Sequence, residues 1–236
     1  MQDKIIAKDK WEFNKEVTEC FDDMLNRSIP EIEIMRDLTE KIGRHFIKSN
    51  TEIIDLGCST GLAIKPFIKD RKAKTKFRLF DVSDAMLEKC RENYQKEIKE
   101  GFVSVEKFDI RNGLDETSCA SLILCVLTLQ FTPIEYRQKI VKSIYDTLAK
   151  GCALILVEKV LGYNYKIDKI LVDEYYNKKR ENAYTNEQIE AKRKSLEGVL
   201  VPITAKWNEE LLKSVGFSEI DCFWRYLNFC GWIAIK

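Results

Sequence analysis

The chain has 236 residues, of which 45% are hydrophobic and 33% are charged, and its 39 basic and 38 acidic side chains give a net charge of +1. This length suits one large α/β domain, and the composition excludes wholesale disorder. The balanced charge provides no global positive field for phosphates, so direct nucleic-acid binding is not expected.

Short apolar strands alternate with amphipathic helices along most of the chain, a pattern typical of βαβ units and a parallel sheet. Residues 1–48 are predicted to form a mostly helical N-terminal extension. The main domain follows at residues 49–236, with a helical insertion at about residues 163–200. We predict a doubly wound, Rossmann-like α/β fold with a seven-stranded, mostly parallel sheet. Its strands are expected at residues 52–56, 76–81, 102–108, 121–127, 153–158, 219–224 and 231–236.

Helices are expected between these strands. Ser83 is the expected N-cap of one helix, and a second helix spans residues 133–148, with Gly151 of the pair Lys150-Gly151 as part of its C-cap. A third helix is expected at residues 208–215. Ligands of such sheets bind beyond the carboxyl ends of the strands. The N-terminal extension and the insertion are therefore both expected to cover a binding site there.

Targeting signals and metal-binding patterns are not found. Residues 1–10 are too charged for a signal peptide, and no apolar run approaches the roughly 20 residues that a membrane span needs. We therefore expect a cytoplasmic protein with no membrane association. The eight cysteines are scattered without a C-x-x-C pair, and His45 is the one histidine. Neither a metal site nor a disulfide framework is expected from this pattern.

One loop carries the strongest chemical signal. Asp55-x-Gly57-x-Ser59-x-Gly61 lies directly after the first predicted strand and before a helix. Its glycines let the chain turn tightly and let the backbone approach a ligand. The loop lacks the G-x-G-x-x-G spacing that seats a pyrophosphate on a helix N-terminus, which disfavours a nicotinamide dinucleotide. It resembles the loop with which class I methyltransferases cradle the amino acid part of S-adenosylmethionine.

Two acidic residues follow the next strands at positions suited to the same cofactor. Asp81 ends the second predicted strand, where a carboxylate can accept both ribose hydroxyls. Asp109 follows the third strand, within reach of the exocyclic amine of adenine. The alternative is that these are ordinary turn glycines and exposed acids. Because the ordered set is more specific than a lone glycine motif, we predict that the cofactor is S-adenosyl-L-methionine.

Several motifs that lie far apart in the sequence recur together in one enzyme family. They are residues 21–30, Thr128-Leu129-Gln130-Phe131, Val157-Glu158-Lys159, residues 179–184, residues 192–197 and Asn228-Phe229. With them, the sequence from about Phe13 onward resembles the bacterial carboxy-S-adenosylmethionine synthases of the tRNA wobble-uridine oxyacetate pathway. The resemblance implies an S-adenosylmethionine-dependent transferase of the methyltransferase superfamily, with prephenate as small-molecule substrate. In that family the carbon dioxide that leaves prephenate is captured on the sulfonium methyl carbon, giving carboxy-S-adenosylmethionine and phenylpyruvate.

The same resemblance implies roles for individual residues. Arg193 matches an arginine that pairs with the new carboxylate and comes from the partner subunit, which implies a homodimer. A guanidinium suits that role because its planar fork engages a carboxylate with two hydrogen bonds. Cofactor contacts are implied for Gly57, Cys58 and Ser59 in the loop, Asp81 and Val82 at the ribose, Asp109 and Ile110 at the adenine, and the position of Val126.

Two positions depart from the family pattern. Ile32 replaces a cofactor-contacting tyrosine and Val126 replaces an asparagine, so two polar partners are absent. One alternative is therefore an ordinary methyltransferase acting on a small molecule or nucleic acid, and another is a non-catalytic cofactor-binding module. From the residues alone, Arg193 and the basic run at residues 178–180 are more typical of solvated helix faces than of an anion site.

Overall fold

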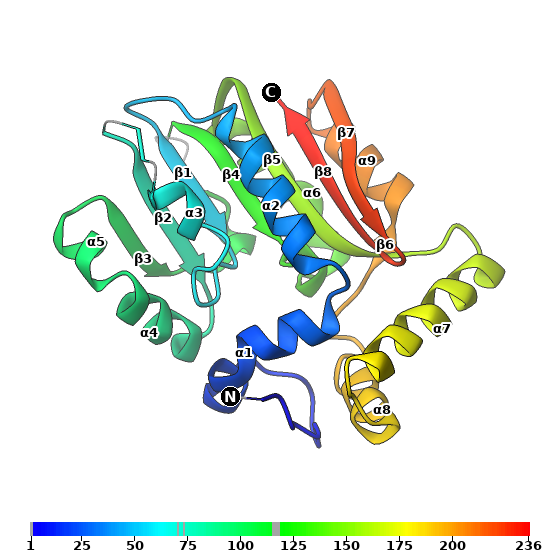
Figure 1. Cartoon of the computed structure of the whole chain (residues 1–236). Helices are drawn as coiled ribbons and strands as arrows, with labels where there is room; N and C mark the ends of the chain where they lie inside the picture. Colours follow the sequence, from blue (N-terminus) through cyan, green and yellow to red (C-terminus); the bar gives the residue numbers. More distant parts are fainter. Residues whose placement is uncertain (1, 70, 73, 115–118) are drawn as a thin grey trace.

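One sheet forms the centre of the computed structural model, which describes residues 2–69, 71–72, 74–114 and 119–236 (Figure 1). Its strand order is β3-β2-β1-β4-β5-β8-β7, and the short β6 (Ile203–Thr204) pairs with β5 outside this path. Neighbours are parallel except that β8 runs antiparallel to β5 and β7. This confirms the predicted doubly wound, mostly parallel sheet. The strands are β1 (Glu52–Leu56), β2 (Lys76–Asp81), β3 (Val103–Lys107), β4 (Ala120–Val126), β5 (Leu148–Leu161), β7 (Glu219–Tyr226) and β8 (Phe229–Ile235).

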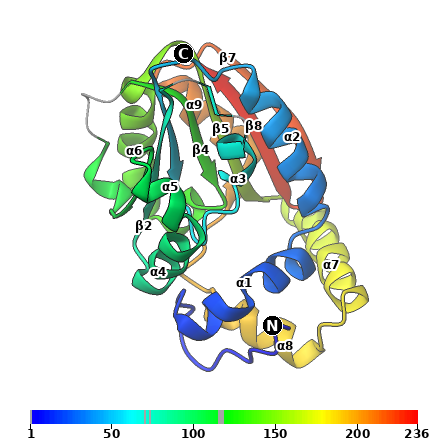
Figure 2. The same cartoon turned by 60° about the vertical axis from the view of Figure 1, so that its left-hand side comes forward.

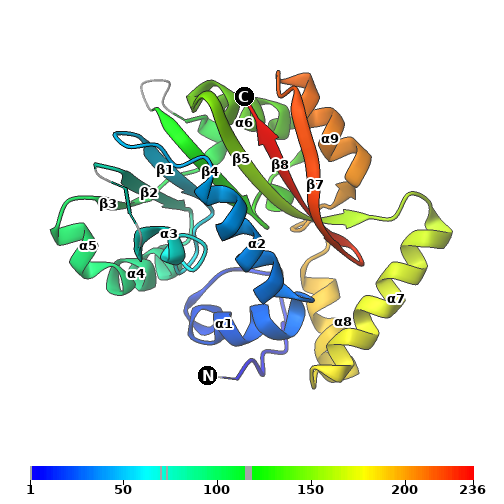
Figure 3. The ribbon, with the colours of Figure 1, turned by 45° about the horizontal axis from the view of Figure 1, so that its top comes forward.

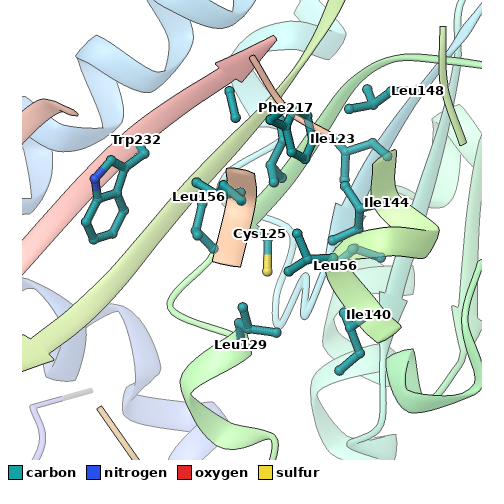
Figure 4. Packing of buried hydrophobic residues seen from close by; sticks show 14 of the residues in the cluster. Leu56, Ile123, Cys125, Leu129, Ile140, Ile144, Leu148, Leu156, Phe217 and Trp232 are labelled. Carbon is teal, nitrogen blue, oxygen red and sulfur yellow. The ribbon is translucent and has the colours of Figure 1, made fainter. Parts of the chain in front are cut away.

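The central strands are apolar on both sides because helices cover both faces of the sheet. One face packs against α6 (Ile134–Thr147) and α9 (Ala205–Ser214). There, Ile140 and Ile144 of α6 belong to the same buried cluster as Leu56 and Leu156 of the sheet (Figure 4). Full burial of these side chains accounts for the near-continuous hydrophobic runs in β4 and β5.

The opposite face is covered by helices from two parts of the chain. The N-terminal α2 lies so close to the sheet that a Cβ atom on Gly43 would come within 2.9 Å of the side chains of Leu122 and Phe67. Thus α2 packs into the core of the domain although it precedes the first strand. The helices on this side are α2 (Ile32–Arg44), α3 (Lys65–Lys69), α4 (Asp84–Asn93) and α5 (Gln95–Lys99).

Helix boundaries follow the capping chemistry at most ends. The predicted N-cap of α4 is confirmed, since Ser83 Oγ accepts a hydrogen bond from the N–H of Met86 at 3.2 Å. The predicted C-cap at Gly151 is wrong, because α6 ends at Thr147 and β5 begins at the next residue. Gly151, with φ of +68°, lies instead where the register between β4 and β5 shifts. The C-terminal helix begins at Ala205, earlier than predicted, because Thr204 caps it.

Three further helices lie away from the sheet, beyond the carboxyl ends of its strands: α1 (Lys15–Ser28), α7 (Tyr165–Glu181) and α8 (Asn186–Ser195) (Figures 1 and 3). The N-terminal segment lies beside α8, where the N–H of Trp11 donates to the carbonyl of Ser195 at 2.9 Å (Figure 2). Residues 2–28 and 165–200 are called the lid below. Within the described residues, no helix has the length and apolar character needed to cross a membrane.

Candidate active site

A cavity of about 1350 Å³ lies between the lid and the carboxyl ends of the central strands. This is the place where open α/β sheets bind their ligands. Two of the residues that were assigned to the site, Gly61 and Arg193, are not on its wall. Those that do line it are Asp55, Gly57, Cys58, Ser59, Asp81, Val82, Asp109, Ile110 and Val126.

The loop after β1 turns back sharply because Gly57 and Gly61 adopt left-handed φ angles of +71° and +85°. Neither position has room for a side chain, since a Cβ atom would overlap Thr128 at the first and Tyr94 at the second. The N–H of Gly57 donates to the carbonyl of Phe80 at 2.8 Å, which ties the loop to β2. Gly57 therefore brings backbone to the cavity wall, whereas Gly61 shapes the loop from behind.

Asp55, at the end of β1, is a buried carboxylate on the cavity wall. It is 1% exposed, and among the described residues its Oδ2 has no hydrogen-bond partner. Burial, followed by the charge of Asp81, raises the pKa of Asp55 to about 7. A cationic group placed beside this oxygen supplies both a hydrogen bond and a compensating charge. The position is therefore suited to an ammonium group.

Asp81 joins the glycine loop to the start of α4. Its two carboxylate oxygens accept the N–H groups of Ser59 and Ser83, each at 2.9 Å. Burial raises the pKa of Asp81, while these backbone hydrogen bonds act in the opposite direction. The carboxylate thus holds two segments of the cavity wall in place and remains on the cavity surface.

Asp109 caps the short helix η1 (Ile110–Asn112), where its Oδ1 accepts the N–H of Arg111 at 3.0 Å. Its carboxylate is also paired with the Arg111 guanidinium, with Nε 2.9 Å from Oδ1, which lowers the pKa of Asp109. Both side chains line the cavity, together with buried Ile110 and exposed Val82. A ligand that bonds to Asp109 therefore shares it with Arg111.

The wall between the acidic residues and β5 is apolar. Val126 ends β4, and Ile32 begins α2 and is 5% exposed. Both residues line the cavity. The two departures from the family pattern therefore lie on the wall itself.

A buried polar network connects β5 to the segment after β4. Glu158 Oε1 accepts the N–H of Leu129 at 3.1 Å, and Gln130 Oε1 accepts the N–H of Lys159 at 2.7 Å. Burial raises the pKa of Glu158 to about 8. The T-L-Q-F and V-E-K motifs, distant in sequence, are thus one structural unit that positions the backbone of Lys159.

Arg27 of α1 closes the lid. Its guanidinium donates to the carbonyl groups of Asn182, Ala183 and Asp3 at 2.8, 2.9 and 2.8 Å. It also lies 4.1 Å from the centroid of the Tyr184 ring, whose hydroxyl donates to Asp3 Oδ2 at 2.5 Å. Arg27 therefore joins the two segments of the lid, in addition to the Trp11–Ser195 and Tyr184–Asp3 hydrogen bonds.

Comparison with known proteins places this chain in a family. A methyltransferase domain model matches residues 53–151. The chain is 38% identical over 232 residues to the carboxy-S-adenosyl-L-methionine synthase of Methylococcus capsulatus, covering 97% of this chain and 94% of that protein. It is 34% identical to the synthase of Nautilia profundicola over the full length of both chains. The chain belongs to the carboxy-S-adenosyl-L-methionine synthase family. The predicted resemblance is confirmed.

Solved structures show the fold that this synthase family member shares with methyltransferases. A putative S-adenosyl-L-methionine-dependent methyltransferase from Methanococcus maripaludis matches with a TM-score of 0.61 at 18% identity, covering 98% of this chain and 97% of that one. An O-methyltransferase family protein from Burkholderia thailandensis gives 0.63 at 14% identity, covering 94% and 60%. The match to the methyltransferase domain family ends at residue 151, whereas the similarity to the synthases covers the whole chain and so includes the lid.

Arg193 of this synthase family member faces away from the cavity of its own chain. It lies on α8, where its guanidinium pairs with Glu190 at 2.8 Å and with Glu197 at 2.6 Å. These partners raise its pKa. In this conformation Arg193 does not reach the cavity of its own chain.

Lys159, Lys179 and Lys192 line the cavity, as do Lys65 and Lys69. The sequence predicts no binding role for Lys159 or Lys192, and it favours a solvated face over an anion site for Lys179. Lys179 is 6% exposed, so the prediction of a solvated face at residues 178–180 is wrong at this position. The spacing indicates that Lys179 and Lys192 turn inward, because residues three or four apart lie on the same helix face. Lys179 is four residues after buried Tyr175, and Lys192 is three residues after buried Ile189. Across the described residues, no group of three or more His, Cys, Asp or Glu is arranged for a metal ion.

Proposed function

We propose that the chain is a cytoplasmic carboxy-S-adenosylmethionine synthase. It converts S-adenosylmethionine and prephenate to carboxy-S-adenosylmethionine, phenylpyruvate and water, and its product serves the modification of wobble uridine in tRNA. The observation that carries this proposal is the similarity to proteins of that name over 97% of the chain, which includes the lid as well as the methyltransferase core.

The cavity wall fits S-adenosylmethionine, which supplies an activated methyl carbon when bound. Asp55 Oδ2, which has no hydrogen-bond partner in the described part of the chain, is suited to the ammonium group of its amino acid part. Gly57 lets the backbone approach that part, and Asp81 is placed for the ribose hydroxyls. Asp109 is then left for the exocyclic amine of the adenine.

The proposed reaction needs alignment and a closed site more than acid–base groups. Prephenate loses its ring carboxyl group as carbon dioxide and its ring hydroxyl as hydroxide. Over the whole reaction, the hydroxide and one methyl proton of S-adenosylmethionine would leave as water, and the carbon dioxide would be carried on that methyl carbon. The chain has to hold both substrates together and keep bulk water out. The lid and the apolar wall at Ile32 and Val126 are suited to that task.

We include in the proposal a homodimer in which Arg193 of one subunit serves the site of the other. The outward position of Arg193 supports this arrangement. Exposed apolar side chains on and beside α7 also favour a protein interface there. They are Tyr163, Tyr165, Ile167 and Ile170.

The test of the activity uses the purified full chain with S-adenosylmethionine and prephenate. Mass spectrometry should detect the carboxylated cofactor, and phenylpyruvate should appear in equal amount. Neither product should form when prephenate is omitted. If the same incubations with a panel of methyl acceptors instead release S-adenosylhomocysteine and no carboxylated cofactor forms, the chain is an ordinary methyltransferase.

A further inference from the structure

The cavity wall carries acidic side chains at β1 and β2 and a lysine at β5. In order across the sheet, Asp81 ends β2, Asp55 lies in β1, Val126 ends β4 and Lys159 lies in β5. All four residues line the cavity. Neighbouring strands lie about 4.8 Å apart, so the wall from β2 to β5 spans about 14 Å. Two ligands can therefore lie side by side, one toward β2 and one toward β5.

Two lysines of the lid join Lys159 at the β5 end of this wall. The Nζ atoms of Lys159 and Lys179 lie 4.7 and 5.0 Å from the centroid of the Tyr175 ring, so both amines flank one aromatic ring. Lys192 of α8 places its amine against the ring of Trp11. The three side chains come from β5, α7 and α8, and they converge only when the lid is folded over the sheet.

Among the described residues, none of these three amines forms an ion pair. Asp3 acts on Lys179 and Lys192 from a distance, and Asp168 acts likewise on Lys159, without a direct ion pair among the described residues. Burial lowers the pKa of Lys179 to about 8 and that of Lys192 to about 6. Burying three clustered amines costs folding free energy, and an anionic ligand that pairs with them directly offsets that cost.

We propose that Lys159, Lys179 and Lys192 form a subsite for the carboxylate groups of the second substrate, an organic dianion. This inference rests on the proposed function and deepens it, because prephenate carries two carboxylates. Each ammonium group can donate several hydrogen bonds to carboxylate oxygens. Val126, between the two ends of this wall, then lines the place where the two substrates meet.

The experiment replaces each lysine singly by methionine, which keeps the length of the side chain and removes the charge. Lys169→Met is the matched control on the same helix α7, because Lys169 is 63% exposed and pairs with Asp173. We expect the KM for prephenate to rise about tenfold or more in each lysine variant, the effect of losing one hydrogen bond to a charged group. The KM for S-adenosylmethionine should change by less than about twofold.

A second measurement keeps the subsite separate from the reaction. Prephenate is titrated calorimetrically into each protein saturated with S-adenosylhomocysteine, so that binding is observed without turnover. Unchanged prephenate affinity in all three variants overturns the subsite. So does a loss confined to S-adenosylmethionine, because the lysines then hold the carboxylate of the cofactor itself.

The outcomes for the wild type are distinct from these. A wild-type chain that binds prephenate but forms no carboxylated cofactor rejects the proposed reaction, and the calorimetric comparison of the variants still decides about the subsite. A wild-type chain that binds no prephenate rejects both proposals. Thermal unfolding of each variant at or above the wild-type midpoint shows that a loss of binding is not a loss of folding.

Discussion

Lys192 holds an amine against the ring of Trp11, where burial and the charge of Lys179 lower its pKa from 10.5 to about 6. Between these two pH values the unfolded chain binds more protons at this side chain than the folded chain. By linkage, its contribution to the free energy of unfolding therefore rises with pH across the window. At neutral pH Lys192 lowers the free energy of unfolding. A role in ligand binding, rather than in folding, accounts for a buried lysine at this position.

Lys192→Met should therefore be more stable than the wild type at pH 7, by of order 1–3 kcal/mol. Because the cost of the lysine shrinks toward its unfolded pKa, the gain should become smaller as the pH rises from 7 to 10. The titratable groups that act on it, Lys179, Asp3 and Cys20, are unchanged in the variant. Urea unfolding at several pH values measures the difference. A variant less stable than the wild type throughout shows that the lysine holds the lid together.

Asp55 predicts the pH dependence of cofactor binding. Its pKa is raised to about 7, and only its ionised form attracts an ammonium group. Because the binding-competent fraction falls as the pH drops through 7, the Kd for S-adenosylmethionine should be about tenfold higher at pH 6 than at pH 8. Calorimetric titration measures this change. Asp55→Asn should bind S-adenosylmethionine weakly at both pH values. If this variant keeps the full pH dependence, the titrating group is another residue, and Asp81 is the first candidate.

At the scale of single residues, the sequence predicts the positions of the cavity carboxylates better than those of the cavity lysines. Asp55 and Asp81 lie at the carboxyl ends of strands that are evident as apolar runs, so their position at the cavity follows from the topology of the sheet. The lysines of α7 and α8 lie in charged runs, and only the packing of the lid decides which of them turn inward. Spacing from Tyr175 and Ile189 is a weak signal because those helices have few buried positions.

Among the elements, the two segments of the lid share several contacts, and Arg27 makes the largest set of them. Arg27→Ala removes hydrogen bonds to three carbonyl groups, at Asn182, Ala183 and Asp3. We expect α8 to exchange its amide hydrogens about tenfold faster or more, and the KM for both substrates to rise, because the loss of hydrogen bonds favours local opening. Arg225→Ala, at an exposed position of β7, is the control. If the amide hydrogens of α8 exchange equally slowly in both variants, Arg27 does not hold the lid in place.

The elements themselves were predictable where periodicity and caps agree, as at Ser83 and along the sheet. The packing of α2 was not. Apolar periodicity shows that a helix buries one face, but it does not show which partner covers that face. Gly151 was misassigned for a similar reason, since a glycine after a helix resembles a C-cap until the register of the neighbouring strand is known.

For the whole molecule, the proposed dimer predicts complementation between two inactive variants. Arg193→Ala lacks the residue given to the partner, and Asp81→Ala has a defective cofactor wall. If dimers are two-fold symmetric and re-form at random, an equal mixture contains one intact site in about four. Carboxylated cofactor should then form at about a quarter of the wild-type rate, although each variant alone is inactive. Additive residual activity in the mixture contradicts a shared site.

The two-part lid has a consequence for the order in which the molecule is made. Arg27 and Asn182 are separated by 155 positions, and β8, at residues 229–235, lies between β5 and β7 in the finished sheet. Synthesis proceeds from the N-terminus, so α1 leaves the ribosome long before its partners exist. Contacts at such separation also form late in folding because their loops are long. The cavity is therefore completed last, and a nascent chain acquires its substrate-binding wall only once the final third has emerged.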